Sequence, residues 1–204
     1  MFENLRRDSA RYANDGGWFT HPGFWVVATY RLGVWAHSLR NPLLRLPMWV
    51  VYRVLRFPCA LWNVALWAGP DGARIGAGFC LIHPVNVYIS HGVEIGEDCL
   101  IFHEVTLGTG PIPGRPKIGN HVDIYAGARL VGGVVVGDYA VVGPNCVVSR
   151  DVPAHSSVVV AQCRIIPHSM RAEAEPKARA DDRDAEPILL SPSERRHHQG
   201  RDQG

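Results

Sequence analysis

The sequence predicts a single-stranded parallel β-helix, preceded by a short α-helical region and followed by a disordered tail. The first observation is an aliphatic residue that returns at every sixth position across residues 75–152. A period of six is neither the 3.6 of a helix nor the two of a simple strand, and it is typical of coils built from six-residue units. The second observation is a glycine that often follows the aliphatic residue, where a tight corner is needed. Stacked units then bury the aliphatic side chains as one continuous core.

The aliphatic ladder consists of three runs, which are Ile75, Leu81 and Val87, then Ile89, Ile95, Ile101 and Leu107, and then Ile118, Ile124, Leu130, Val136, Val142 and Val148. The spacing breaks twice. It is eight between Val87 and Ile95, an insertion of two residues, and eleven between Leu107 and Ile118, where residues 109–117 leave the coil. Insertions in such repeats form loops, often on the binding face.

Both breaks come shortly after a segment that contains a histidine, His83 or His103. We therefore prefer a functional interpretation of the breaks to the alternative of tolerated surface insertions. His83 follows the ladder residue Leu81, and its side chain is expected to project outward at a corner. A neutral imidazole is suited to take a proton from a hydroxyl at physiological pH, so His83 is the first candidate for a general base and His103 the second.

Residues 1–68 are expected to form helices, over 1–15, 24–39 and 43–67. The last segment is very apolar, but its arginines, and its prolines at 47 and 58, argue against a membrane span. We expect prolines to interrupt it and the helix to pack on the end of the solenoid or on a neighbouring subunit. The rival interpretation is peripheral membrane contact through residues 43–67, because tryptophan and arginine suit a headgroup boundary.

Residues 69–166 form the predicted β-helix domain, and residues 167–204, poor in large apolar residues, are expected to be disordered. The formal net charge of +2 gives no indication of nucleic-acid binding.

The five cysteines show no CxxC spacing, so we expect no metal site, no disulfide framework and a cytoplasmic protein with reduced thiols. We see no signal peptide, because Arg6 and Arg7 are followed by polar residues.

Several motifs extend the repeat to a known family. They are Val105-Thr106-Leu107-Gly108, Pro116-Lys117-Ile118-Gly119, Ala126-Gly127-Ala128 and, upstream, Tyr30-Arg31-Leu32-Gly33. Together they resemble the serine O-acetyltransferase family of left-handed β-helix acyltransferases, which includes relatives that acetylate exopolysaccharide sugars. The resemblance covers residues 8–166, and the left-handed sense of the coil rests on it.

The resemblance implies acetyl transfer from acetyl-CoA to a hydroxyl, with no metal. It implies that His83 is the general base, because the spacing from His83 to Ile95 matches the family. It also implies a set of residues along the CoA arm, namely Gly108, Ala126, Gly127, Gly143 and Arg164. The family forms trimers with active sites between subunits, and the short helical region favours a homotrimer here.

The chain departs from the family at positions that contact the acceptor. Ile82 stands where serine acetyltransferases have an aspartate before the catalytic histidine, and Arg115 stands where they have a second histidine. An upstream acid helps to bind serine in the family, and Asp15 or Asp8 can fill that place. We predict Asp15 and Arg115 as substrate-binding residues.

Three functions follow. The first is acetylation of L-serine for cysteine biosynthesis. The second is O-acetylation of a sugar of an exopolysaccharide or capsular polysaccharide, which the departures and the short, basic helical region favour. The third is a β-helix scaffold that has lost activity.

Overall fold

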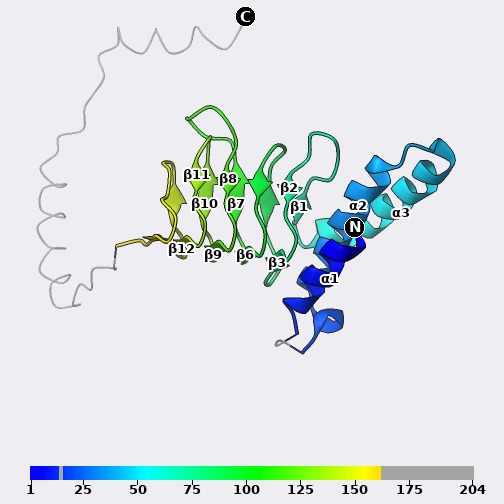
Figure 1. The fold of residues 1–204 in the computed structure, drawn as a ribbon, viewed down its shortest axis with the longest axis horizontal. Helices are drawn as coiled ribbons and strands as arrows, with labels where there is room; N and C mark the ends of the chain where they lie inside the picture. The colour runs from blue at the N-terminus through cyan, green and yellow to red at the C-terminus, as the bar shows by residue number, and fades with distance from the viewer. Residues whose placement is uncertain (14–15, 162–204) are drawn as a thin grey trace, which may run out of the picture. The chain divides into compact units, whose positions relative to one another are not determined.

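The structure, a computed structural model, describes residues 1–13 and 16–161. Three α helices, α1 (Phe2–Ala10), α2 (Pro22–Ser38) and α3 (Pro42–Leu61), come first, with a short 3₁₀ turn η1 (Trp18–Thr20) between the first two. They lie at one end of a stack of short strands (Figure 1). The predicted disordered tail lies outside the described residues, and the predicted domain boundaries at 68 and 166 stay predictions.

Short parallel strands build the rest of the described chain. They are β1 (Ala65–Leu66), β2 (Arg74–Ile75), β3 (Cys80–Leu81), β4 (Tyr88–Ile89), β5 (Glu94–Ile95), β6 (Leu100–Ile101), β7 (Thr106–Gly108), β8 (Lys117–Ile118), β9 (Asp123–Ile124), β10 (Arg129–Val131), β11 (Val135–Val136), β12 (Val141–Val142), β13 (Val147–Val148) and β14 (Ser157–Val158). Strands that are three apart in the chain pair in register, except that β14 pairs with β12. The result is three sheets: β1-β4-β7-β10-β13, β2-β5-β8-β11 and β3-β6-β9-β12-β14. We call them sheets A, B and C. The predicted left-handed parallel β-helix is confirmed.

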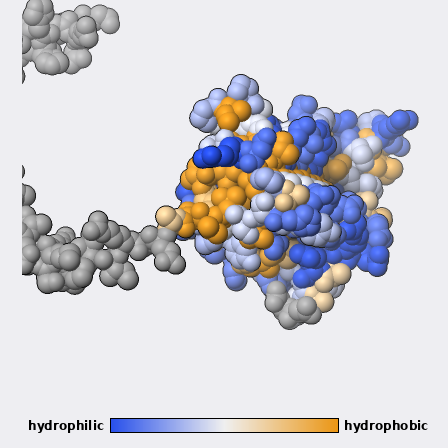
Figure 2. All heavy atoms as spheres, turned by 60° about the vertical axis from the view of Figure 1, so that its left-hand side comes forward, coloured by the Kyte–Doolittle hydropathy of each residue, from blue (hydrophilic) through white to orange (hydrophobic). Residues whose placement is uncertain are grey.

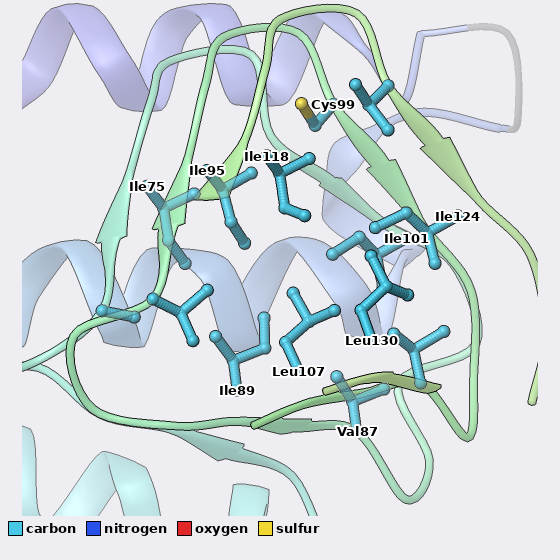
Figure 3. Packing of buried hydrophobic residues seen from close by; sticks show 14 of the residues in the cluster. Ile75, Val87, Ile89, Ile95, Cys99, Ile101, Leu107, Ile118, Ile124 and Leu130 are labelled. Atoms are coloured by element: carbon cyan, nitrogen blue, oxygen red, sulfur yellow. The ribbon is translucent and has the colours of Figure 1, made fainter. Parts of the chain in front are cut away.

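The predicted ladder forms the core. Figure 3 shows Ile75, Ile95 and Ile118 stacked in sheet B, and Ile89, Leu107 and Leu130 stacked in sheet A. Ladder side chains in sheets A and C are fully buried at Ile89, Leu107 and Ile101. The glycine after the ladder residue is required in sheet B: a Cβ on Gly76 or Gly96 would lie 2.5 Å from the backbone of the next coil.

The predicted position of the first insertion is wrong. Ile89, not Val87, continues the ladder, because Ile89 pairs with Leu107 and with Leu66. Val87 instead fills the buried slot two residues before the ladder position. The two extra residues therefore lie between Leu81 and Ile89, and the insertion contains His83.

The helices close the open N-terminal edge of the solenoid through polar side chains. The buried carboxylate of Asp8 accepts from Phe79 N at 2.9 Å and from Arg31 Nε at 2.9 Å. Arg31 Nη1 also donates to the Ile75 carbonyl at 2.6 Å, and the Tyr12 hydroxyl accepts from Leu81 N at 2.9 Å. No coil precedes the first one, so some of its backbone N–H and C=O groups have no neighbouring strand to pair with. The bonds from the helices satisfy these groups.

Helix α3 begins at a good cap, since Asn41 Oδ1 accepts from Leu43 N at 2.9 Å and Pro42 takes the first helical position. The expected interruption of this segment is wrong, because α3 runs continuously through Pro47 and Pro58. Each proline removes one bond to the carbonyl four residues earlier, and those residues, Leu43 and Val54, are exposed, so solvent can satisfy their carbonyls. No helix in the described chain is long and apolar enough to cross a membrane.

Candidate active site

The corner between sheets C and A holds four of the predicted site residues, which are His83, Ala126, Gly127 and Gly143. Each coil turns there in successive layers, formed by residues 82–87, 102–105, 125–128 and 143–146. Backbone bonds join the layers: Glu104 N donates to the Val85 carbonyl at 2.9 Å, and Gly127 N donates to the His103 carbonyl at 3.1 Å. We call this the histidine corner.

His83 stands out by its backbone. In the described chain, nine non-glycine residues have a positive φ, and all except His83 lie three residues before a ladder position, where the coil turns. His83 adopts φ 51 in the inserted residues, and its carbonyl accepts from Val85 N at 2.7 Å. A left-handed conformation costs a non-glycine residue about 1–2 kcal/mol. The insertion thus holds an exposed imidazole in a special conformation at the corner.

A second imidazole lies beside the first. The rings of His83 and His103 are 6.1 Å apart and nearly edge to face. Residues 1–13 and 16–161 provide no side-chain hydrogen bond to the ring nitrogens of His83, so no carboxylate of this chain's described part orients it. The Nδ1 atom of His103 is buried and has no hydrogen-bond partner among the same residues. The two rings can face one ligand at this corner.

A pocket of about 680 Å³ opens beside His83. The side chains around it are Arg11, His21, Cys80, Ile82, His83, Leu100 and Phe102. Its wall on the solenoid is therefore mostly apolar, and its wall on the helical region is basic. Phe102 extends the apolar wall by stacking on Tyr125, with ring centroids 5.0 Å apart and an interplanar angle of 13°.

Asp123 lies next to the apolar wall, because it is the strand partner of the wall residue Leu100 across β6 and β9. Burial raises the pKa of the Asp123 carboxyl, and the positive charge of Arg11 offsets part of that effect. Sequence analysis missed Asp123, Arg11 and His21. The sequence offers one indication for Asp123, which is its outward position just before a ladder residue. The two basic residues reach the pocket only through the packing of the helices, which the sequence does not reveal.

The predicted CoA-binding residues are not equivalent. Gly127 has φ 73, and a Cβ there would lie 2.2 Å from Asn145 Oδ1, while a Cβ on Gly143 would lie 2.9 Å from the Val158 carbonyl. The fold itself therefore demands glycine at both positions. A Cβ on Gly108 would meet nothing closer than 3.8 Å. The fold therefore does not require glycine at this position, and the missing side chain leaves open space there. Ala126 is half-buried in the turn next to Gly127.

The structure separates the other predicted residues from His83. Gly108 and Arg115 lie at the corner between sheets A and B, where Arg115 Nε donates to the His91 carbonyl at 3.0 Å. Asp15 and Arg164 lie outside the described residues. Asp8, the alternative to Asp15, is fully buried and bonded to Arg31 and Phe79, so neither carboxylate oxygen is free for a substrate.

Comparisons with known proteins identify the family of the chain. Residues 115–150 match the family described as Bacterial transferase hexapeptide (six repeats). A serine acetyltransferase of Helicobacter pylori strain J99 is 35% identical over 149 residues, which are 72% of this chain and 82% of the relative. The serine acetyltransferase of Mycobacterium tuberculosis strain H37Rv is 32% identical over 164 residues, 78% of this chain and 66% of the relative.

Solved structures give the same result. A serine acetyltransferase in complex with CoA superposes with a TM-score of 0.61 at 26% identity, covering 80% of this chain and 68% of the other. The CoA complex of the Brucella abortus strain S19 enzyme has a TM-score of 0.59 at 26% identity, covering 79% and 66%. The fold and these similarities define a hexapeptide-repeat acyltransferase. The chain belongs to the serine acetyltransferase family.

Proposed function

We propose that the protein transfers the acetyl group of acetyl-CoA to the hydroxyl of L-serine, with His83 as general base. The observation that carries the proposal is the position of His83, exposed in the two-residue insertion beside the pocket. The family membership supports the donor and the acceptor, because relatives named serine acetyltransferase have been solved with CoA.

The chemistry needs few groups. The neutral imidazole of His83 accepts the proton of the acceptor hydroxyl as its oxygen attacks the thioester carbonyl. The new C–O bond gives a tetrahedral oxyanion, and we propose that hydrogen-bond donors near the corner of the solenoid stabilise it. Collapse of the oxyanion breaks the C–S bond, and the imidazolium returns its proton to the leaving sulfur. Gly108, Ala126, Gly127, Gly143 and Arg164 are the residues that we propose for binding the CoA arm.

We further propose a cytoplasmic homotrimer. A trimer would place the corner that holds Arg115 and Gly108 of one subunit near the histidine corner of the next, so that one site draws on two chains. Asp15 and Arg115 are then proposed to contact the acceptor. Exposed apolar side chains of the strands, such as Val135 and Val147, suit contacts between subunits. Figure 2 shows hydrophobic residues gathered in the middle of one face, with hydrophilic residues around them. The four described cysteines are buried and form no disulfide with one another, which suits a reducing compartment.

A second candidate is O-acetylation of a polysaccharide sugar. The observation that favours it is the apolar wall of the pocket, where Ile82 replaces an acid and Phe102 stacks on Tyr125. A flat aromatic surface suits the C–H face of a sugar ring better than the charged ends of an amino acid.

The test is thiol release from acetyl-CoA by the purified protein, with L-serine and with a panel of free and lipid-linked sugars. Saturable release with L-serine supports the first proposal. Release only with sugars supports the second. Binding of acetyl-CoA without any turnover, or no binding, contradicts both and leaves an inactive scaffold.

A further inference from the structure

Helix α3 presents its apolar side to solvent, the reverse of an ordinary surface helix. Its inner side, with Tyr52 and Cys59, is buried. Six large apolar residues, spaced three or four apart and so on one side of the helix, are 48–83% exposed: Leu43, Leu46, Val50, Val54, Phe57 and Leu61. Such a stripe on the surface of a protein marks a binding site for another apolar surface.

The charged side chains of the segment around α3 are all positive. Residues 16–70 contain no aspartate or glutamate, but they contain five arginines. Among the residues that the structure describes, only Arg31 of these is paired with an acid, the buried Asp8. Arg40, Arg45 and Arg53 are exposed and form no ion pair with any residue in the described ranges. The apolar stripe is therefore accompanied by positive charge that has no partner in this part of the protein.

Tryptophans and a groove complete the surface. Trp49 and Trp62 are 38% and 41% exposed, and the Arg53 guanidinium lies 5.2 Å from the Trp49 ring centroid. A groove of about 390 Å³ between α2 and α3 is lined almost wholly by apolar side chains, among them Leu55 and Trp25. Indole rings beside cationic groups suit the boundary between headgroups and acyl chains, and the groove can accept an acyl chain.

A second copy of the chain fits this surface less well. A two-fold contact would place the same patch against itself, so arginines would meet arginines or apolar side chains without any carboxylate from residues 16–70. Lipid phosphates supply the missing negative charge.

We propose that α3 docks the protein on the surface of an anionic membrane, with Leu43, Leu46, Val50, Val54, Phe57 and Leu61 among the acyl chains and Arg40, Arg45 and Arg53 at the phosphates. The helix lies on the membrane and does not span it. This inference is independent of the acceptor, since it rests on a surface that does not line the pocket beside His83.

Co-sedimentation of the full-length protein with vesicles tests the proposal. One set contains phosphatidylcholine alone, and the other contains phosphatidylcholine with about one third phosphatidylserine. The variants are Leu46→Glu with Phe57→Glu, which acts on the stripe, and Arg45→Gln with Arg53→Gln, which acts on the charge. Val160→Glu, an exposed valine after β14, is the matched control. Circular dichroism and thermal unfolding show that each variant is folded.

We expect binding to the anionic vesicles that weakens with salt. Each arginine contributes a factor of about five, so the double arginine variant should bind about 25-fold more weakly. The double glutamate variant should not bind, and Val160→Glu should bind like the wild type. Equal binding to both vesicle types, or equal loss in Val160→Glu, overturns the proposal. So does the absence of vesicle binding, and a fall in oligomer mass in Leu46→Glu with Phe57→Glu would then assign the surface to a contact between copies.

Discussion

Replacement of Asp8 by alanine is expected to be the most damaging single change in the helical region. Asp8 is fully buried, and Arg31 is only 5% exposed. The carboxylate accepts from Arg31 Nε at 2.9 Å, from Arg31 Nη2 at 3.1 Å and from Phe79 N at 2.9 Å. The change removes all three bonds and leaves a guanidinium charge buried without its counterion.

The magnitude follows from the geometry. Removing one partner of a buried ion pair costs about 3–5 kcal/mol. The buried Phe79 N–H also loses its acceptor, for which about 1–3 kcal/mol is typical. These losses overlap, and Arg31 keeps its bonds to the Ile75 and Gly76 carbonyls, so we expect a total of about 4 kcal/mol. That is a large part of the 5–15 kcal/mol by which a domain is usually stable.

Urea unfolding followed by circular dichroism measures the change in free energy of unfolding. Glu3→Ala is the matched control, because Glu3 lies on the same helix and forms an exposed pair with Arg6, and it should leave the midpoint unchanged. Asp8→Ala with Arg31→Met should be more stable than Asp8→Ala alone, since the uncompensated charge is gone. A free energy of unfolding for Asp8→Ala within 1 kcal/mol of the wild type would refute the reasoning.

Three further predictions concern the core and the site. Ile101→Ala should lower the free energy of unfolding by about 2–5 kcal/mol in urea, because it opens a cavity in a fully buried ladder; a loss below 1 kcal/mol would contradict the continuous core. Asp123→Asn should raise the Tm at pH 7. Burial raises the pKa of the Asp123 carboxyl, so the protonated carboxyl stabilises the folded state. That stabilisation is lost as the pH rises from the ordinary pKa of the carboxyl through its raised pKa, and the carboxylate that remains at pH 7 is unfavourably buried. The gain should shrink as the pH falls toward the ordinary carboxyl range, and a lower Tm at pH 7 would show that the Arg11 charge outweighs burial. Gly108→Ala should keep the wild-type Tm but raise the KM for acetyl-CoA, whereas Gly127→Ala should lower the Tm; an unchanged KM in Gly108→Ala would remove that residue from the CoA path.

The β-helix could be predicted because its signal is local and repeated. A ladder residue such as Ile101 or Ile124 comes from one fixed spacing, and each repeat confirms the next. The spacing leaves one ladder position ambiguous, because both Val87 and Ile89 are aliphatic residues that could occupy it. Both are buried, and only pairing with the neighbouring coils decides between them.

The site could be predicted only in part. The spacing of the repeat indicates His83 and His103 as the two candidates, and only the resemblance to the serine O-acetyltransferase family favours His83. The basic wall of the pocket could not be found, since Arg11 and His21 reach it through the packing of α1 and α2 on the first coil. The continuity of α3 could not be predicted either, because solvent exposure of its outer face, which a local pattern does not reveal, makes Pro47 and Pro58 tolerable.

The most direct test of the account compares thiol release from acetyl-CoA, with saturating L-serine, by the wild type and by His83→Asn. His121→Asn is the control, because His121 is an exposed histidine at a different corner, stacked on Tyr139. Loss of a general base lowers the rate by about 10²–10⁴-fold, so we expect that fall in kcat for His83→Asn, with wild-type circular dichroism, and an unchanged kcat for His121→Asn. Wild-type turnover by a folded His83→Asn variant would contradict the account.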